Sequence, residues 1–338
     1  MNRVYQCLKI TTSIVWIGCL SLLSFNTNAA IHPKQQQAIE TINQLYHSLN
    51  EMQKSDMTSR LDTISAQFLG KPYVLGALGE GSHARFDQEP RYRTDAFDCE
   101  TYVTTVLALA LANDTKGFKQ CLSKLRYHNN GQVSYITRNH FTELDWNLNN
   151  QRQGFVKDIT ESFLDKNKVP VAKIAKALID KPSWYQHFTL ATIRLQSQDK
   201  EEQTKRLAEL KSRGSKLPRT NAELPYIPLT SLFNAKGEPN QYLFAQIPDG
   251  AIIEIVRPNW NLREQIGTNL NVSHLGFAFW KKGVLTFRQA SSIYNKVVDV
   301  SLIDYLKEAH EKSPTIKGIN VQIVVPKTPL TNSCGISA

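Results

Sequence analysis

The sequence predicts an α+β fold in which helices come first and an antiparallel sheet follows. Apolar residues recur at helical spacing between residues 32 and 67, and they alternate with polar residues in several short runs after residue 226. A helical first part followed by a run of strands is typical of α+β proteins rather than of alternating α/β folds. A single short helix, predicted over residues 302–310, interrupts the strands.

The first 29 residues are predicted to be a signal peptide. A basic start and an apolar run over residues 10 to about 23 precede small residues at Thr27 and Ala29, which suit cleavage after Ala29 or Ala30. Two alternatives remain open: a membrane anchor, although the run is shorter than the ~20 apolar residues that span a bilayer, and a lipoprotein acylated on Cys19. Cleavage would give an exported protein, periplasmic or secreted, without a stable membrane span.

The mature chain after residue 29 would have 309 of the 338 residues and a net charge of +8 instead of +10. This length suffices for one domain, predicted over residues 30–338, with helices at 30–69 and a helical insertion at about 150–220. No basic run is dense enough to indicate nucleic-acid binding. The positive charge either keeps the protein soluble or attracts an anionic partner such as the cell wall.

Local patterns predict the remaining elements in chain order. The helical part comprises two amphipathic helices at 32–67, a Gly/Pro-rich loop at 70–93, helices at about 99–112 and 118–125, a strand at 132–137, and a charged, mostly helical segment at 156–216. The later strands are predicted at 251–256, 273–280, 284–290, 296–300 and 319–325.

Three cysteines remain after the signal peptide: Cys99, Cys121 and Cys334. In an oxidising compartment an odd number leaves one thiol free or paired with another chain. Cys99 is free if Cys121 and Cys334 are bridged, and three unrelated reduced thiols are the alternative. No Cys/His spacing suggests zinc, so neither a metal nor another cofactor is expected.

Cys99 is the candidate nucleophile because it follows Asp98, a predicted N-cap, at the start of a helix. The helix N-terminus carries a partial positive charge and free N–H groups. This environment is expected to lower the pKa of the thiol from its usual ~8.5, and the same amides could stabilise an oxyanion. A buried structural cysteine is the alternative.

His274 and Gln289 are the candidate partners of Cys99. Alternation along the strand at 273–280 places His274 on one face with Gly276 and Ala278, and places the core on the other face with Leu275, Phe277 and Phe279. A two-residue turn within residues 281–283 would bring Gln289 to the His274 face, where its amide oxygen could orient the imidazole. A three-residue turn would place Gln289 on the opposite face.

Three motifs resemble the NlpC-type papain-like cell-wall hydrolases: Lys-Pro-Tyr-Val-Leu-Gly at 71–76, Phe-Asp-Cys at 97–99 and Ser-His-Leu-Gly at 273–276. Further motifs at 78–81, 138–141, 145–146 and 288–292 resemble one branch, the N-acetylmuramoyl-L-alanine amidase-like family, and the resemblance extends from about 60 to 327. It implies a papain-like fold, with the nucleophile helix packed on an antiparallel sheet. It also implies a catalytic set of Cys99, His274 and Gln289, with Tyr73 beside the nucleophile.

Two features depart from this pattern. The third catalytic position is often histidine, whereas glutamine stands at 289, and glutamine stabilises an imidazolium less than a charged group does. The segment between Cys99 and His274 is also far longer than in the smallest members, so it is expected to form walls, a lid or a lobe beside the site.

The resemblance implies a peptidoglycan hydrolase that takes a muropeptide substrate and cuts the amide between N-acetylmuramic acid and L-Ala. The alternatives are an endopeptidase acting between γ-D-Glu and a diamino acid, a non-catalytic wall-binding module, and a general protease or transglutaminase-like enzyme. Arginines in the loop before Cys99 could bind stem-peptide carboxylates. The candidate substrate-binding residues are Glu80, Arg85, Arg91, Arg93, His140, Asp145 and Trp146.

Overall fold

The computed structural model describes residues 32–52, 56–332 and 334–335, so the predicted signal peptide lies outside the described residues. The two N-terminal helices form where the sequence predicted them, as α1 (Pro33–Glu51) and α2 (Met57–Ala66). No helix in the described part of the chain is long and apolar enough to cross a membrane.

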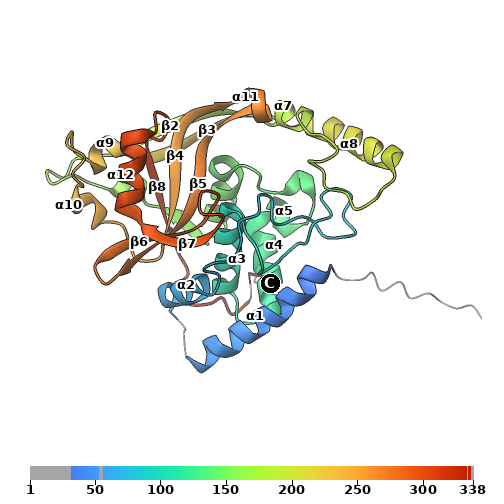
Figure 1. Ribbon diagram of the computed structural model, residues 1–338, viewed down its shortest axis with the longest axis horizontal. Coiled ribbons are helices and arrows are strands. Elements are labelled where there is room, and N and C mark those ends of the chain that lie inside the picture. The colour runs from blue at the N-terminus through green and yellow to red at the C-terminus, as the bar shows by residue number, and fades with distance from the viewer. Residues whose placement is uncertain (1–31, 53–55, 333, 336–338) are drawn as a thin grey trace, which may run out of the picture. The chain divides into compact units, whose positions relative to one another are not determined.

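The central helix α3 (Cys99–Leu111) determines where the candidate nucleophile lies. It is apolar on all sides, and every residue from Thr101 to Leu111 is buried. A helix that is hydrophobic all round belongs in a protein core. It packs between α2, α4 (Thr115–Arg126) and the sheet (Figure 1). The start of α3, with Cys99, is therefore held by a rigid element.

Eight strands form one sheet in the part of the chain that the structure describes. The main path runs β2 (Lys173–Asp180), β3 (Arg219–Pro228), β8 (Gly318–Val324), β4 (Ala251–Leu262), β5 (Thr268–Lys281), β6 (Val284–Ser291) and β7 (Lys296–Ser301). The short strand β1 (Val156–Asp158) also pairs with β8, and all pairings are antiparallel. The predicted α+β fold with an antiparallel sheet is confirmed.

The sheet is covered on both faces. Leu275 and Phe277 of β5 join a hydrophobic core with α1 to α4, whereas Ala278 joins a second core with α12 (Leu302–Lys312). Figure 1 shows α12 on one side of the central strands and α3 on the other. Small helices α9 (Leu229–Leu232) and α10 (Gln241–Phe244) complete the second core. The alternation predicted for β5 is confirmed, and both of its faces are packed.

The segment between α4 and β3 differs from the prediction of a mostly helical insertion. Its elements are α5 (His128–Gly131), a 3₁₀ turn (Tyr135–Thr137), a π-helical turn (Thr142–Trp146), α6 (Asn147–Arg152), β1, a 3₁₀ turn (Thr160–Ser162), β2, α7 (Lys181–Gln186) and α8 (Lys200–Gly214). Farther along the chain, α11 (Arg263–Ile266) lies between β4 and β5.

Two predicted elements in this segment are wrong. The Lys- and Ala-rich β2 has residues with high helix propensity, but it pairs along its whole length with β3 and buries Ala175, Ala177 and Ile179 on one face. Tertiary pairing therefore overrides local propensity. The strand predicted at 132–137 is instead a 3₁₀ turn, because Tyr135 is buried in an aromatic cluster with Tyr185 and Phe188 rather than in a strand ladder.

A disulfide ties the C-terminal part of the chain to α4. Cys121 and Cys334 are bridged, with Cα atoms 5.0 Å apart and a sequence separation of 213. Cys99 is free. This confirms the pairing in which the candidate nucleophile remains a thiol, and it rejects the alternative of three unrelated reduced thiols.

Thiol titration of the folded mature chain should give one reactive group, because the bridge removes two of the three cysteines. Titration after reduction and unfolding should give three. Peptide mapping under non-reducing conditions should recover a Cys121–Cys334 peptide. A map in which Cys99 forms the bridge would contradict both the pairing and the proposed nucleophile.

Candidate active site

Cys99 is the first residue of α3, and Asp98 caps the helix as predicted. The Asp98 carboxylate accepts a hydrogen bond from the Thr101 backbone N–H at 2.8 Å, and the Thr101 hydroxyl accepts one from the Asp98 N–H at 2.9 Å. This reciprocal capping box satisfies two helix-terminal donors. It stops the chain from continuing as helix before Cys99, so the thiol lies at the helix start.

Tyr73 is held beside the nucleophile by backbone pairing. The segment around Tyr73 pairs with Phe97: the Val74 N–H donates to the Phe97 carbonyl at 2.9 Å, and the Phe97 N–H donates to the Pro72 carbonyl at 3.0 Å. Burial raises the pKa of Tyr73 to about 12, and the nearby Cys99 and Asp98 add to that rise. The structure thus brings Tyr73 next to Cys99, and the phenol stays protonated at neutral pH.

His274 and Gln289 meet across the β5–β6 hairpin. The turn has two residues, Lys282 and Gly283, both with positive φ, and Lys281 pairs with Val284. Positive φ at both positions is the geometry of a tight hairpin turn. The resulting register brings the Gln289 side-chain oxygen into a hydrogen bond with Nε2 of His274. The two-residue alternative is therefore confirmed and the three-residue turn is rejected.

Gly276, two residues after His274 in β5, has no room for a side chain. A Cβ at this position would lie 2.6 Å from the Arg288 carbonyl oxygen and 2.7 Å from the Phe287 ring. Neither backbone nor a packed aromatic ring can move cheaply. The strand therefore requires glycine here, which explains the small residue that the alternation pattern placed on this face.

The backbone of β5 reaches the thiol at the residue after His274. The Leu275 amide lies within hydrogen-bonding reach of the Cys99 sulfur, as does the Glu100 amide. The Asp98 carboxylate acts electrostatically on both Cys99 and His274. Tyr305 of α12 also lies near both residues: its ring centroid is 6.5 Å from that of His274, and it interacts electrostatically with Cys99.

The pKa values define the resting state of this pair. Burial and the adjacent Asp98 raise the pKa of the Cys99 thiol to about 12, and the Leu275 and Glu100 amides only partly offset them. The thiol pKa predicted from the helix start alone, below its usual value, is therefore wrong, because desolvation outweighs the helix N-terminus. Burial lowers the pKa of His274 to about 4, against the opposing effect of Gln289. At neutral pH Cys99 is therefore a thiol and His274 a neutral imidazole.

The acid limb of the pH–rate profile should report His274. A neutral imidazole is needed to take the thiol proton, so activity should persist well below pH 6.5 and fall near pH 4. Gln289→Glu would place a carboxylate on the imidazole, raise its pKa and move the acid limb to higher pH. Because a depressed histidine pKa also makes the fold less stable as pH falls from 6.5 towards 4, melting curves at each pH must accompany the rates. An acid limb that does not move in Gln289→Glu would contradict this assignment.

Glu80 supports the loop before the nucleophile instead of facing open solvent. It is buried, accepts a hydrogen bond from the Tyr127 hydroxyl at 2.6 Å and pairs with Arg138. Arg138 also pairs with Asp87 at 2.8 Å, and Asp87 pairs with Arg194. Each of these charges has an opposite partner, as buried charges require. The structure therefore gives Glu80 a positioning role.

Two of the three predicted carboxylate-binding arginines are already paired with protein carboxylates. Arg85 bonds Glu202 at 2.8 Å and Glu209 at 2.6 Å on α8, and Arg93 is buried against Asp95 with two bonds of 2.6 Å. A substrate carboxylate would have to displace these partners. The loop thus folds onto acidic side chains, and the role of Arg85 and Arg93 in carboxylate binding stays a prediction.

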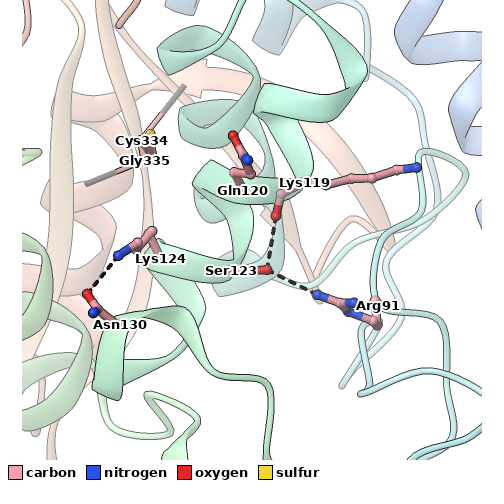
Figure 2. Close-up of a pocket in the computed structure, with 8 residues that line it drawn as sticks. All are labelled: Arg91, Lys119, Gln120, Ser123, Lys124, Asn130, Cys334 and Gly335. Carbon is pink, nitrogen blue, oxygen red and sulfur yellow. Dashed lines mark hydrogen bonds between the residues drawn. The ribbon is translucent and has the colours of Figure 1, made fainter. Parts of the chain in front are cut away.

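Arg91 lies at a different place from the catalytic residues. Its guanidinium donates to the Ser123 hydroxyl at 3.1 Å and lines a cavity of about 460 Å³ with Lys119 and Lys124. Figure 2 shows the Arg91–Ser123 hydrogen bond and the one from Lys124 to Asn130, with Cys334 among the other lining residues. Cys99, His274 and Gln289 do not line it. Arg91 is thus not brought to the thiol.

The remaining predicted substrate-binding residues are Trp146, His140 and Asp145. Each of them bonds a protein group other than Cys99 and His274. Trp146 is fully buried and donates from its indole to the Thr104 hydroxyl at 3.0 Å, so it cannot meet a sugar face. His140 bonds the Tyr135 carbonyl at 2.7 Å, and burial holds the pKa of its imidazole well below the usual value. Asp145 pairs with Lys181 at 2.6 Å and lines a polar cavity of about 540 Å³.

The sequence did not identify Tyr305 and Arg257 as candidate site residues, although the fold brings both close to His274. Tyr305 belongs to α12, and nothing in the helical pattern at 302–310 distinguishes it. Arg257 of β4 interacts electrostatically with Tyr305. Among the described residues, no group of three histidine, cysteine or carboxylate side chains is arranged to hold a metal ion.

A family model and several solved structures match most of this chain. The AmiA-like family model, described as N-acetylmuramoyl-L-alanine amidase-like, matches residues 63–316. A crystal structure of a protein from Legionella pneumophila str. Philadelphia 1 is 58% identical, with a TM-score of 0.84, over 88% of this chain and 97% of that one. No curated protein matches the sequence.

Two more distant structures share the fold. An N-acetylmuramoyl-L-alanine amidase from Bacteroides uniformis is 26% identical, with a TM-score of 0.52, over 80% of this chain and 99% of that one. A Bacteroides fragilis structure provisionally assigned as a xylanase is 24% identical, with a TM-score of 0.52, over 77% of this chain and 99% of that one. The family match covers most of the chain, and this protein belongs to the N-acetylmuramoyl-L-alanine amidase-like family.

Proposed function

We propose that this protein is an exported cysteine amidase that hydrolyses the bond between N-acetylmuramic acid and L-Ala in peptidoglycan fragments. The observation that carries the proposal is a free thiol at a helix start, reached by the backbone amide that follows His274, whose imidazole is bonded to Gln289. The nucleophile helix packed on an antiparallel sheet corresponds to a papain-like arrangement of the NlpC type.

The proposed first step is acylation. The Gln289 side-chain oxygen accepts the Nε2 proton of His274, which leaves Nδ1 of the imidazole as the base. Nδ1 takes the proton of the Cys99 thiol while the sulfur attacks the lactyl carbonyl carbon of muramic acid. The resulting oxyanion is stabilised by amides at the start of α3, with Tyr73 beside them. His274 then protonates the L-Ala nitrogen, the C–N bond breaks, and a thioester remains.

Deacylation uses the same groups. His274 takes a proton from water, whose oxygen attacks the thioester carbonyl, and the C–S bond breaks to release the muramic acid carboxyl group. The sulfur regains its proton from His274. The high thiol pKa makes the proton transfer to His274 part of the attack, instead of a preformed thiolate–imidazolium pair.

The cellular location is part of the proposal. A Cys121–Cys334 disulfide fits an oxidising compartment such as the periplasm, and the first 29 residues have the composition of a signal peptide. The family description and the amidase name of the Bacteroides uniformis structure favour a cell-wall substrate.

Mass spectrometry of digested muropeptides tests the bond. An amidase should release the intact stem peptide with a new amino group on L-Ala and leave a peptide-free sugar. A γ-D-Glu endopeptidase would leave L-Ala-D-Glu on the sugar and release fragments that begin at the diamino acid. Cys99→Ala is the matched control for background hydrolysis. Sugar that retains L-Ala-D-Glu would reject the amidase proposal, and no product from any muropeptide, anhydro forms included, would reject the cell-wall substrate.

A further inference from the structure

Arg257 is a guanidinium without a carboxylate partner close to the candidate active site. It forms no ion pair with any residue that the structure describes, and its Nε lies buried without a hydrogen-bond partner among those residues. One other nitrogen, Nη1, donates to the Thr315 hydroxyl at 3.0 Å, and Cζ lies 4.5 Å from the centroid of the Trp260 ring. The side chain is therefore held in place while part of its hydrogen-bonding capacity is unused.

The position of Arg257 follows from an irregularity in β4. Ile255 pairs with His274, but the register shifts on both sides of Val256 before pairing resumes at Trp260. Such bulges re-aim side chains and occur often beside active sites. Arg257 lies within this irregular stretch, two residues beyond Ile255, the direct strand neighbour of His274. Regular pairing would have continued the ladder through this point.

Tyr305 connects Arg257 to the thiol. Its ring lies 5.4 Å from that of Phe287 and 6.5 Å from that of His274, centroid to centroid. Burial raises the pKa of Tyr305 to about 12; the Arg257 charge opposes that rise and the Cys99 sulfur adds to it. Arg257 and Cys99 both lie close enough to Tyr305 to act on it electrostatically. Tyr305 is therefore a common neighbour of His274, Cys99 and Arg257.

The chemistry of the reaction determines which part of the substrate lies there. His274 must face the departing nitrogen in order to protonate it, and in the proposed reaction that nitrogen belongs to L-Ala. The region beyond His274 therefore receives the stem peptide rather than the sugar. The first free carboxylate along that peptide is the α-carboxylate of D-Glu, because D-Glu is linked onward through its γ-carboxyl group.

We propose that Arg257 binds the α-carboxylate of the second stem-peptide residue and selects for it over an amide. This inference rests on the proposed function. A carboxylate at the guanidinium would neutralise an otherwise unpaired charge. The arginines predicted from the sequence for this role, Arg85 and Arg93, are already paired with protein carboxylates.

The test compares two muropeptides that differ only at this group, one with D-Glu and one with D-isoglutamine. The wild-type enzyme should prefer the carboxylate by about 10- to 100-fold in kcat/KM, the range expected for a hydrogen bond to a charged group. Arg257→Gln should bring the two substrates to within about threefold of each other, mainly through loss on the D-Glu substrate. Arg257→Met, which keeps contact with Trp260, provides a second uncharged variant if Arg257→Gln does not fold.

Arg263→Gln is the matched control, because Arg263 is an exposed arginine on α11. It should retain the wild-type preference. A wild-type enzyme that does not distinguish the substrates, or an Arg257 variant that keeps the preference, would overturn the inference.

A binding measurement separates this inference from the proposed reaction. If the wild-type enzyme cleaves neither muropeptide, calorimetry with Cys99→Ala still compares L-Ala-γ-D-Glu-diaminopimelate with its isoglutamine analogue. Tighter binding of the carboxylate form, lost in Cys99→Ala/Arg257→Gln, would support Arg257 even though the reaction proposal had failed. Equal binding of both peptides would reject the Arg257 inference.

Discussion

Cys99→Ala is expected to abolish muropeptide cleavage, with kcat reduced by about 10⁵- to 10⁶-fold, as for removal of a nucleophile from other acyl-transfer enzymes. The reason is that no other free cysteine is present among the described residues, and the helix-start and Leu275 amides converge on this sulfur. The fold should not change, because Cys99 is only half-buried while the rest of α3 remains packed. The measurement is product release by chromatography, with circular dichroism and melting temperature for the fold.

The double variant Cys121→Ala/Cys334→Ala is the matched control. It removes the other two cysteines of the mature chain and should lower the free energy of unfolding by about 2–5 kcal/mol while retaining activity at low temperature. Iodoacetamide should still inactivate this variant through Cys99, and EDTA should leave the wild-type enzyme active. Turnover by Cys99→Ala, or loss of activity in EDTA that zinc restores, would reject the cysteine mechanism.

His274→Ala is expected to have the second-largest effect, a loss of at least about 10²- to 10⁴-fold in kcat, the usual contribution of a general acid–base. The loss should be severe because the thiol pKa of about 12 leaves almost no thiolate at neutral pH without a base. Added imidazole should restore part of the activity by entering the space that the side chain leaves. Rates with and without imidazole, measured at the same pH, provide the test.

His47→Ala is the control for this variant. His47 is an exposed histidine on α1 that lies 3.4 Å from Glu51, and its replacement should change neither rate nor imidazole dependence. The kcat of Gln289→Ala should lie between those of His274→Ala and His47→Ala, because this variant keeps the base but loses the group that orients it. A His274→Ala enzyme with wild-type kcat would show that another group takes the thiol proton.

Much of the catalytic arrangement could be predicted from the sequence because its signals are local. The Asp98–Thr101 capping box spans four residues and defines the helix start at Cys99. The two-residue turn at Lys282–Gly283 defines the register that aligns Gln289 with His274. Hydrophobic alternation in β5 identifies its core face correctly. Each of these depends on hydrogen bonds or periodicities within a few residues of the chain.

The features that the sequence did not predict depended on contacts between distant segments. The partners of Arg85 on α8 lie 117 and 124 residues away, so no local pattern could reveal that its charge is already neutralised. The strand β2 exists because β3 pairs with it, despite residues that favour a helix. Trp146 matched a motif, but its burial against Thr104 of α3 excludes the predicted sugar contact.

The sequence by itself determined the α+β class, the helix that presents Cys99, the strand that carries His274 and the hairpin that supplies Gln289. Only the tertiary structure decided the protonation states of Cys99 and His274 and showed that Arg257 is an unpaired cation close to them. Desolvation raises the pKa of Cys99 and lowers that of His274 because the surrounding fold limits the contact of both groups with water. Likewise, Arg257 lacks a carboxylate partner among the described residues only because of where the β4 bulge, α12 and the Thr315 loop meet in space. Burial and charge pairing are properties of the assembled molecule, and they depend on residues far apart along the chain.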